Sequence, residues 1–204
     1  MKLINKLSFL IVMISLSTMM SAQKLKTYEG KFPKMKGEKA LLVEFDYSDM
    51  SVGKFDKEAD YVTKKVNEKN DDEAGSGDAW SKAWVNDREK RFEGKFFELF
   101  NKYAEKKMLK ASKTTDNANY KLLLKTVHTE PGFNVGVVRR PAHCNFEVWL
   151  YKIGENNPVA KARLKKVLGQ DAMGFDFDTG QRLAESYAKA GKIIGKYFEK
   201  DLLK

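Results

Sequence analysis

The chain has 204 residues and one cysteine, and its 38 basic and 28 acidic residues give a net charge of +10. A single cysteine excludes an intramolecular disulfide, so the fold must rest on its hydrophobic core. The length fits one domain of ordinary size. The sequence has no Gly-x-Ser-x-Gly motif, phosphate-binding glycine loop or dinucleotide-binding fingerprint, and this excludes the enzyme classes that depend on those motifs.

Residues 1–22 have the three parts of a secretory signal peptide. Two lysines precede an almost unbroken apolar run, Leu7–Met20, and Ala22 precedes Gln23 at the expected cleavage position. The run is too short to span a bilayer comfortably. Because Gln23 occupies the position where a lipoprotein has its anchoring cysteine, we expect a mature chain in the periplasm or outside the cell, without a lipid anchor or a transmembrane segment.

The charge of the mature chain indicates what it can contact. Cleavage after Ala22 would remove two of the 38 basic residues and none of the 28 acidic ones, which lowers the net charge from +10 to +8. On an exported protein this excess favours anionic envelope material such as lipid headgroups, acidic polysaccharide or wall polymer. We do not expect nucleic acid as a partner, because an exported chain rarely meets it. The oligomeric state stays open.

The first part of the mature chain is expected to form an arm, a strand and a helix. Residues 23–38 are basic and interrupted by two glycines and a proline, which predicts an extended arm before a single domain at residues 39–204. Lys39–Asp46 is an apolar run of strand length, typical of a buried central strand. A short helix near residues 58–66 and a flexible acidic loop at residues 71–77 are expected to follow.

Two long helices are predicted from apolar side chains that recur mostly every three or four residues. The first, residues 78–108, contains no proline and a single glycine. The second, residues 179–203, follows Asp178, which can cap it, and Gln181 can complete a capping box. The second helix also has a strip of small residues that lets it approach a neighbour closely: Ala184, Ala188, Gly191 and Gly195.

Three strands are predicted between these helices, at residues 120–129, 143–153 and 159–168, where apolar and polar residues alternate. In the second strand, Trp149 and Tyr151 point away from the side that holds Phe146, Val148 and Leu150. In the third strand, the inward residues are expected to be Ala160, Ala162, Leu164 and Leu168.

The order of elements, a strand, a helix, three strands and a helix, predicts an α+β fold. We expect a two-layer sandwich in which a mostly antiparallel sheet of about four strands carries the two long helices on one face. No internal repeat is present that would indicate a solenoid.

The side chains suited to catalysis or metal binding do not form a recognised motif. They are His128, Glu130, His143 and Cys144. Their spacing matches no zinc site. Cys144 is a candidate nucleophile only if His128 reaches it from a neighbouring strand as a base. Asp176–Asp178 begins like a calcium loop but lacks the later ligands. We therefore expect no catalytic residue, no bound metal and no cofactor.

One group of basic residues is a candidate binding surface. It consists of Arg139, Arg140, Lys161, Arg163 and Lys165. These residues form either a solvated outer face that guards a strand edge or a shallow cationic surface for an anionic partner. In the second case, Trp149 and Tyr151 would flank the surface and add stacking area. The choice depends on which face of strand 143–153 the helices cover.

Two segments of the chain are Glu-Pro-Gly-Phe-Asn-Val-Gly from residue 130 and Arg-Leu-Ala-Glu-Ser-Tyr-Ala-Lys-Ala-Gly-Lys from residue 182. Together they resemble a group of exported Bacteroidetes proteins of uncharacterised function. The Ala22–Gln23 junction is similar to signal cleavage sites of that phylum. The order of elements is also similar to that of small envelope modules, namely curli-secretion lipoproteins, the TolB amino-terminal domain and penicillin-binding-protein activators. The resemblance implies a binding or assembly role and supplies no catalytic residue.

These observations favour an exported, non-catalytic module that binds an anionic polymer or a protein of the cell envelope. One alternative is an envelope hydrolase acting on wall or glycan material, which requires a deep pocket where His128, His143 or Cys144 meets an acid. Another alternative is a subunit of an envelope assembly, which requires a contiguous exposed apolar patch.

Overall fold

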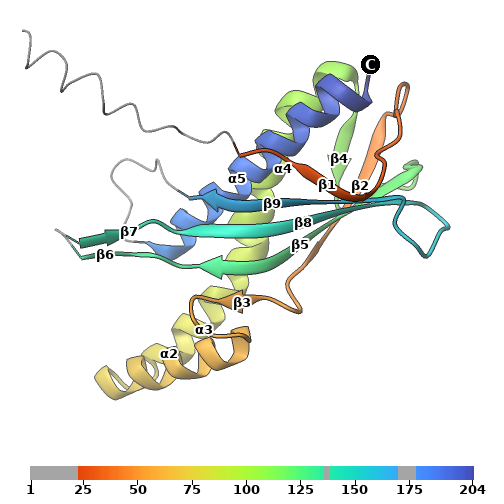
Figure 1. Cartoon of the computed structure of the whole chain (residues 1–204). Helices are drawn as coiled ribbons and strands as arrows, with labels where there is room; N and C mark the ends of the chain where they lie inside the picture. The colour runs from red at the N-terminus through yellow and green to blue at the C-terminus, as the bar shows by residue number, and fades with distance from the viewer. Residues whose placement is uncertain (1–22, 136–137, 170–177) are drawn as a thin grey trace, which may run out of the picture.

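A mixed β-sheet and helices on one of its faces form two layers in the computed structural model, which describes residues 23–135, 138–169 and 178–204 (Figure 1). The predicted α+β class is confirmed; the predicted signal peptide and Asp176 lie outside these ranges. The strands are β1 Lys26–Gly30, β2 Ala40–Asp46, β3 Ser51–Val52, β4 Lys110–Ser112, β5 Tyr120–Glu130, β6 Phe133–Val135, β7 Val138–Arg140, β8 His143–Lys152 and β9 Ala160–Leu168.

The main sheet is larger than predicted and mixed, which corrects the expectation of about four mostly antiparallel strands. Its order is β1-β9-β8-β5-β2-β4, and β3 adds to β5. β1, β9, β8 and β5 pair antiparallel, whereas β2 runs parallel to both β5 and β4. Parallel neighbours need a crossover connection, and the helices between β2 and β4 supply it. β1, β3 and β4 are too short to show an alternating pattern in the sequence.

The segment expected to be an extended arm, residues 23–38, contributes an edge strand and two core residues. Lys26–Gly30 pairs with β9 as β1. Phe32 and Met35 are buried, and the Met35 N–H donates to the Leu202 carbonyl oxygen at 2.7 Å. All five residues of β1 are exposed, so no apolar pattern marks this strand in the sequence.

Two long helical stretches are present, as predicted. The first comprises α3 Ser76–Asp87, the π-helical η1 Arg88–Glu93, α4 Gly94–Ala104 and the short η2 Glu105–Lys107. The second comprises α5 Thr179–Tyr197 and the π-helical η3 Phe198–Leu202. Asp178 caps α5, since its Oδ1 accepts the Gly180 N–H at 2.8 Å. Ahead of them, α2 (Glu58–Asp72) is longer than predicted, and α2 and α3 take up most of the loop expected at residues 71–77.

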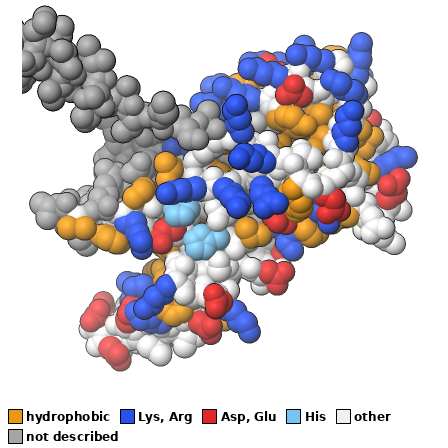
Figure 2. All heavy atoms as spheres, in the orientation of Figure 1, with side chains coloured by type: hydrophobic (Ala, Val, Ile, Leu, Met, Phe, Trp, Pro, Cys, Tyr) orange, Lys and Arg blue, Asp and Glu red, His pale blue; other side chains and the backbone are white. Residues whose placement is uncertain are grey.

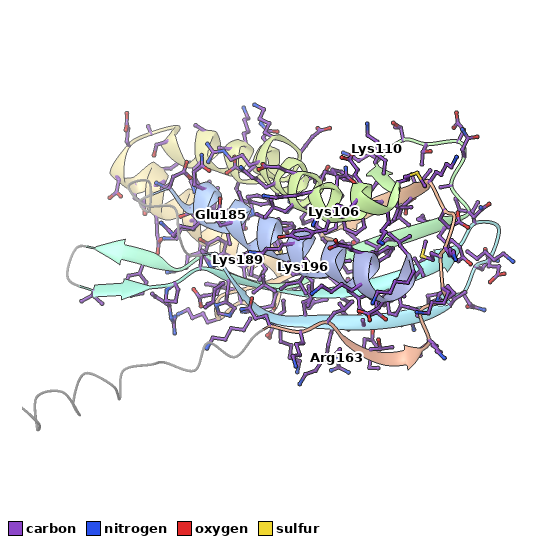
Figure 3. All side chains as sticks on the ribbon, turned by 90° about the horizontal axis from the view of Figure 1, so that it is seen from above. Lys106, Lys110, Arg163, Glu185, Lys189 and Lys196 are labelled. Atoms are coloured by element: carbon purple, nitrogen blue, oxygen red, sulfur yellow. The ribbon has the colours of Figure 1, made fainter. Side chains whose placement is uncertain are left out.

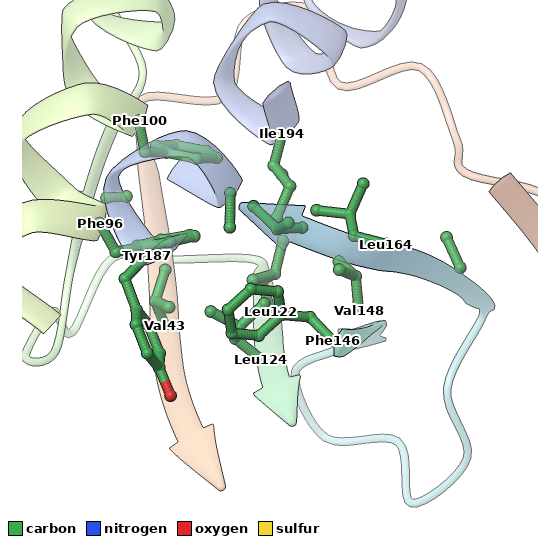
Figure 4. Close-up of a cluster of buried hydrophobic side chains, with 14 of the residues drawn as sticks. Val43, Phe96, Phe100, Leu122, Leu124, Phe146, Val148, Leu164, Tyr187 and Ile194 are labelled. Carbon is green, nitrogen blue, oxygen red and sulfur yellow. The ribbon is translucent and has the colours of Figure 1, made fainter. Parts of the chain in front are cut away.

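Helices α4 and α5 lie side by side against one face of the sheet and close the core. Figure 4 shows the side chains that meet there, with Phe96, Phe100, Tyr187 and Ile194 from the helices and Val43, Leu122, Leu124, Phe146, Val148 and Leu164 from the strands. Each of them is at most 1% exposed. Without a disulfide, this apolar contact between the layers is the main source of stability.

Small residues let α5 approach α4 closely, as the sequence predicts. A Cβ atom added at Gly191 would lie 2.3 Å from the Phe96 carbonyl oxygen, and one added at Gly195 would lie 2.6 Å from the Phe100 carbonyl oxygen. Both distances are far below van der Waals contact. Glycine at these positions therefore sets how closely the two helices pack.

Replacing Gly191 by alanine should destabilise the protein, although alanine favours a helix by about 1 kcal/mol over glycine. Overpacking costs about 1–3 kcal/mol or more, and here the obstacle is backbone that cannot move aside. Gly94→Ala is the matched control, because nothing lies within 4 Å of a Cβ atom there, and it should stabilise by about 0.5–1 kcal/mol. Urea unfolding measures both variants. Equal midpoints would contradict the role of this contact.

Candidate functional site

The face of the sheet opposite α4 and α5 is turned outward, and we call it the open face. Figure 3 shows the two layers from above, with Arg163 pointing away from the helical layer. Every second residue of β8 from Cys144 to Leu150 is buried toward the helices, so Trp149 and Tyr151 lie on the open face, partly exposed. Figure 2 views this face, across which Lys and Arg side chains gather. The geometry required for a cationic surface flanked by aromatic rings is therefore present.

Trp149 is the centre of an aromatic–cationic cluster on the open face. The ammonium groups of Lys125 and Lys161 lie 5.0 Å and 4.8 Å from its ring centroid. The Trp149 N–H donates to Glu147 Oε2 at 2.9 Å and to the Tyr28 hydroxyl at 3.2 Å. Lys161 is the cross-strand partner of Trp149, so strand register alone brings these two side chains together. Each cation–π contact contributes about 0.5–1 kcal/mol at an exposed site.

Three lysines of the open face already have carboxylate partners. The pairs, with their N–O distances, are Lys161–Glu29 (2.9 Å), Lys125–Asp46 (3.1 Å) and Lys121–Glu44 (3.1 Å). The hydrogen bond to Glu29 raises the pKa of Lys161. Partial burial, the largest single cause, lowers the pKa of Lys125, but the hydrogen bonds and charges of Asp46 and Asp49 together outweigh it and the pKa is raised. An anion that binds these lysines has to compete with the carboxylates.

Arg163 differs from these lysines, because no carboxylate of the described residues lies within 4.0 Å of its guanidinium. Its guanidinium carbon lies 4.5 Å from the Tyr28 ring centroid. Glu147, its cross-strand neighbour in β8, accepts the Trp149 N–H instead. Stacking on Tyr28 holds the planar group in place and leaves its N–H donors available for a ligand.

A β-bulge near the end of β9 places two consecutive lysines on this strand's exposed surface. Between the pairs Cys144–Val167 and Phe146–Leu164, β9 has one residue more than β8. Lys166 has a φ of +52°, and its N–H donates to Asn145 Oδ1 at 2.7 Å. Lys165 and Lys166 are both exposed. The bulge also corrects the predicted inward position of Leu168, because it turns Val167 into the core instead.

The predicted five-residue surface is divided in the structure. Lys161, Arg163 and Lys165 share β9, but Arg140 lies in the hairpin of β6 and β7. Arg140 is 63% exposed, and its Nη1 lies 3.4 Å from Glu130 Oε2. The side chain of Arg139 lies outside what the structure describes. Nearness in sequence is misleading here, since β8 runs about 20 Å from its start to Trp149.

The candidate catalytic residues are separated by the sheet. Cys144 is buried on the side of the helices, and burial raises the pKa of its thiol to about 12. His128 and His143 lie on the open face with their ring centroids 5.8 Å apart. Burial and the neighbouring His128 lower the pKa of His143. A cysteine–histidine nucleophile therefore does not form.

A hydrolase requires a pocket that holds the candidate catalytic residues, and an assembly subunit requires a contiguous exposed apolar patch. Among the residues that the structure describes, no group of three His, Cys, Asp or Glu side chains is arranged to hold a metal ion. A cavity of about 440 Å³ is lined by Val43, Glu44, Phe45, Asp46, Glu93, Lys113 and Leu123. None of these is a histidine or cysteine, so the residues named for a hydrolase do not meet in it. The exposed large apolar side chains are spread over several elements: Tyr28, Val85, Met108, Phe133, Val138 and Ile153.

Three residues of the open face, Tyr28, Lys121 and Lys125, were not predicted as site residues. Lys121 and Lys125 alternate with the buried Leu122 and Leu124 in β5, which identifies their face of the strand but not their neighbours. Tyr28 lies in β1, where no apolar pattern indicates a strand. Only the pairing of β1 with β9 brings its ring beside the indole.

No family model matches the chain, and no curated protein or solved structure matches it either. The resemblance to exported Bacteroidetes proteins and to envelope modules stays a prediction. Among the described helices, none combines the length and the apolar character needed to cross a membrane.

The thiol of Cys144 should be almost unreactive in the folded protein. Its pKa is raised from 9.0 to about 12, so the reactive thiolate is scarce at pH 8, and the side chain is also out of contact with solvent. We expect an aromatic disulfide reagent to react on the order of 100-fold or more slowly with native protein than with urea-unfolded protein. Similar rates in the two states would contradict the buried position.

Proposed function

We propose that the chain is an exported, non-catalytic binding module of the cell envelope that holds an anionic envelope component along β9, on the open face. Arg163 is the observation that carries this proposal. Its guanidinium is stacked on Tyr28 and has no carboxylate partner among the described residues. A guanidinium presents paired N–H donors that match carboxylate and phosphate groups.

The neighbours of Arg163 extend the site in both directions along the strand. Lys161 and Lys165 occupy the alternate positions of β9. Side chains two residues apart on a strand are about 6.6 Å apart, so the three cations form a short row. Such a row suits a polymer with repeated negative charges better than a single small ion. Export, as expected from the signal peptide, would bring this row into contact with envelope polymers.

The aromatic part of the cluster adds a second kind of contact. Trp149 and Tyr151 are partly exposed beside the row. Aromatic rings offer flat apolar area at little conformational cost, and the Lys125 and Lys161 ammonium groups already lie close to the indole. A polymer that combines negative charges with apolar ring faces, as an acidic polysaccharide does, fits both features. We therefore place acidic polysaccharide first among the anionic components.

Charge reversal in β9 tests the proposal. The variant Arg163→Glu with Lys165→Glu should bind purified envelope fragments at least tenfold more weakly, a change of about 1.4 kcal/mol. The matched control reverses two exposed lysines of the helical layer, Lys102→Glu with Lys192→Glu, and has the same net charge. It should bind like the unaltered protein. Binding is measured by co-sedimentation with the fragments.

The same variants identify the component and can overturn the proposal. Alginate tests an acidic polysaccharide, and phosphatidylglycerol vesicles test an anionic lipid surface. Higher ionic strength should weaken binding of the unaltered protein, because the contact is exposed and electrostatic. Equal loss in the β9 variant and the helical-layer control would show that net charge alone matters. Unchanged binding of the β9 variant would exclude this surface.

A further inference from the structure

Two histidines form a separate cluster on the open face, away from Trp149. His128 belongs to β5 and His143 begins β8. Their ring centroids are 5.8 Å apart, with 44° between the ring planes. Figure 2 shows the two histidines close together at the surface. Neither belongs to the row of cations along β9.

Ser51 determines which nitrogen of His128 is free. Ser51 of β3 is the register partner of His128. Its hydroxyl donates to the Val127 carbonyl oxygen at 3.2 Å, and its oxygen lies 2.9 Å from His128 Nδ1. Ser51 therefore occupies Nδ1 of His128, whichever of the two groups donates. The nitrogen left for a ligand is Nε2, and it can bind one in the tautomer that has the proton on Nδ1.

His143, the second ring of the pair, lies beside the backbone of Pro141. The Pro141 backbone favours the protonated ring of His143, although burial and the neighbouring His128 lower its pKa. Metal-ligating histidines usually have an arrangement in which the second nitrogen donates to a carbonyl, a carboxylate or another oxygen. Ser51 gives the His128 ring this arrangement.

We propose that His128 and His143 chelate one divalent transition-metal ion, His128 through Nε2 and His143 through one nitrogen of its ring. An imidazole nitrogen binds such an ion at about 2.1 Å, which puts the centroid of its ring roughly 3.2 Å from the ion. The centroids of two rings that bind the same ion can therefore be at most ~6.4 Å apart. The observed 5.8 Å fits this limit. Imidazole ligands suit Zn²⁺, Ni²⁺ and Cu²⁺, and affinity is highest for Cu²⁺.

The charges around the pair favour a modest, exchangeable site. Glu130 is the register partner of His143 and contributes a negative charge, while Lys166 contributes a positive one. Glu130 is itself held by the Gly132 N–H at 3.1 Å and by Arg140 at 3.4 Å. Within the described ranges no third side chain completes a three-ligand set. Water or a bound ligand would fill the other positions on the metal.

Copper titration of the chain purified without an affinity tag tests this site. We expect one Cu²⁺ per chain by calorimetry, with an electron paramagnetic resonance spectrum that reports two imidazole nitrogens. His128→Gln and His143→Gln should each weaken this site at least tenfold. The double variant should lose no more than either single variant, because a chelate needs both rings. Ser51→Ala should weaken it less, by loss of ring orientation.

Two results would overturn the proposal. One is a copper stoichiometry and affinity that neither single variant changes. The other is additive loss in the double variant, which would show two independent weak contacts and no chelate. Urea unfolding and circular dichroism verify that each variant is folded. The test uses no envelope component, so its outcome is independent of binding along β9.

Discussion

The close packing of α5 on α4 is the constraint on which the rest of the structure depends. Gly191 and Gly195 let the helix backbones approach so closely that both helices fit on a single face of the sheet. Tyr187 of α5 then fills the space between the layers, stacked on Phe92 at 4.8 Å and edge-on to Phe146 at 5.0 Å. Because both long helices pack against this face, the opposite face of the sheet is stabilised by contacts among its own side chains.

Two β-bulges decide which polar side chains reach that opposite face. β5 and β9 each have an extra residue beside Asn145 of β8. A shift of one residue moves every following side chain to the other face. In β5 the shift turns His128 and Glu130 outward and Thr129 into the core. The histidine pair exists because of this single inserted residue, and without it His128 would face the helices.

Much of the architecture could be predicted from the sequence, and the errors have physical causes. Alternation in β8 correctly separates Trp149 from the buried Phe146, and the small-residue strip correctly predicts close packing of α5. Short strands and bulges leave no periodic signal, so β1, β3, β4 and the position of Leu168 were missed. Tyr28 lies in β1 and has no signal of its own in the sequence. The predicted grouping of Arg140 with Lys161 fails because the long strand β8 separates them.

The charges of the open face show why net charge alone does not define a binding site. At Lys161, an incoming anion must compete with the ion pair to Glu29 and must preserve the contact with the indole. At Arg163, nothing charged has to be displaced, and stacking on Tyr28 has already restricted the side chain. The first anionic group of a ligand therefore gains most at Arg163. Lys161 and Lys165 then contribute as neighbours, because a polymer held at one position meets them at high effective concentration.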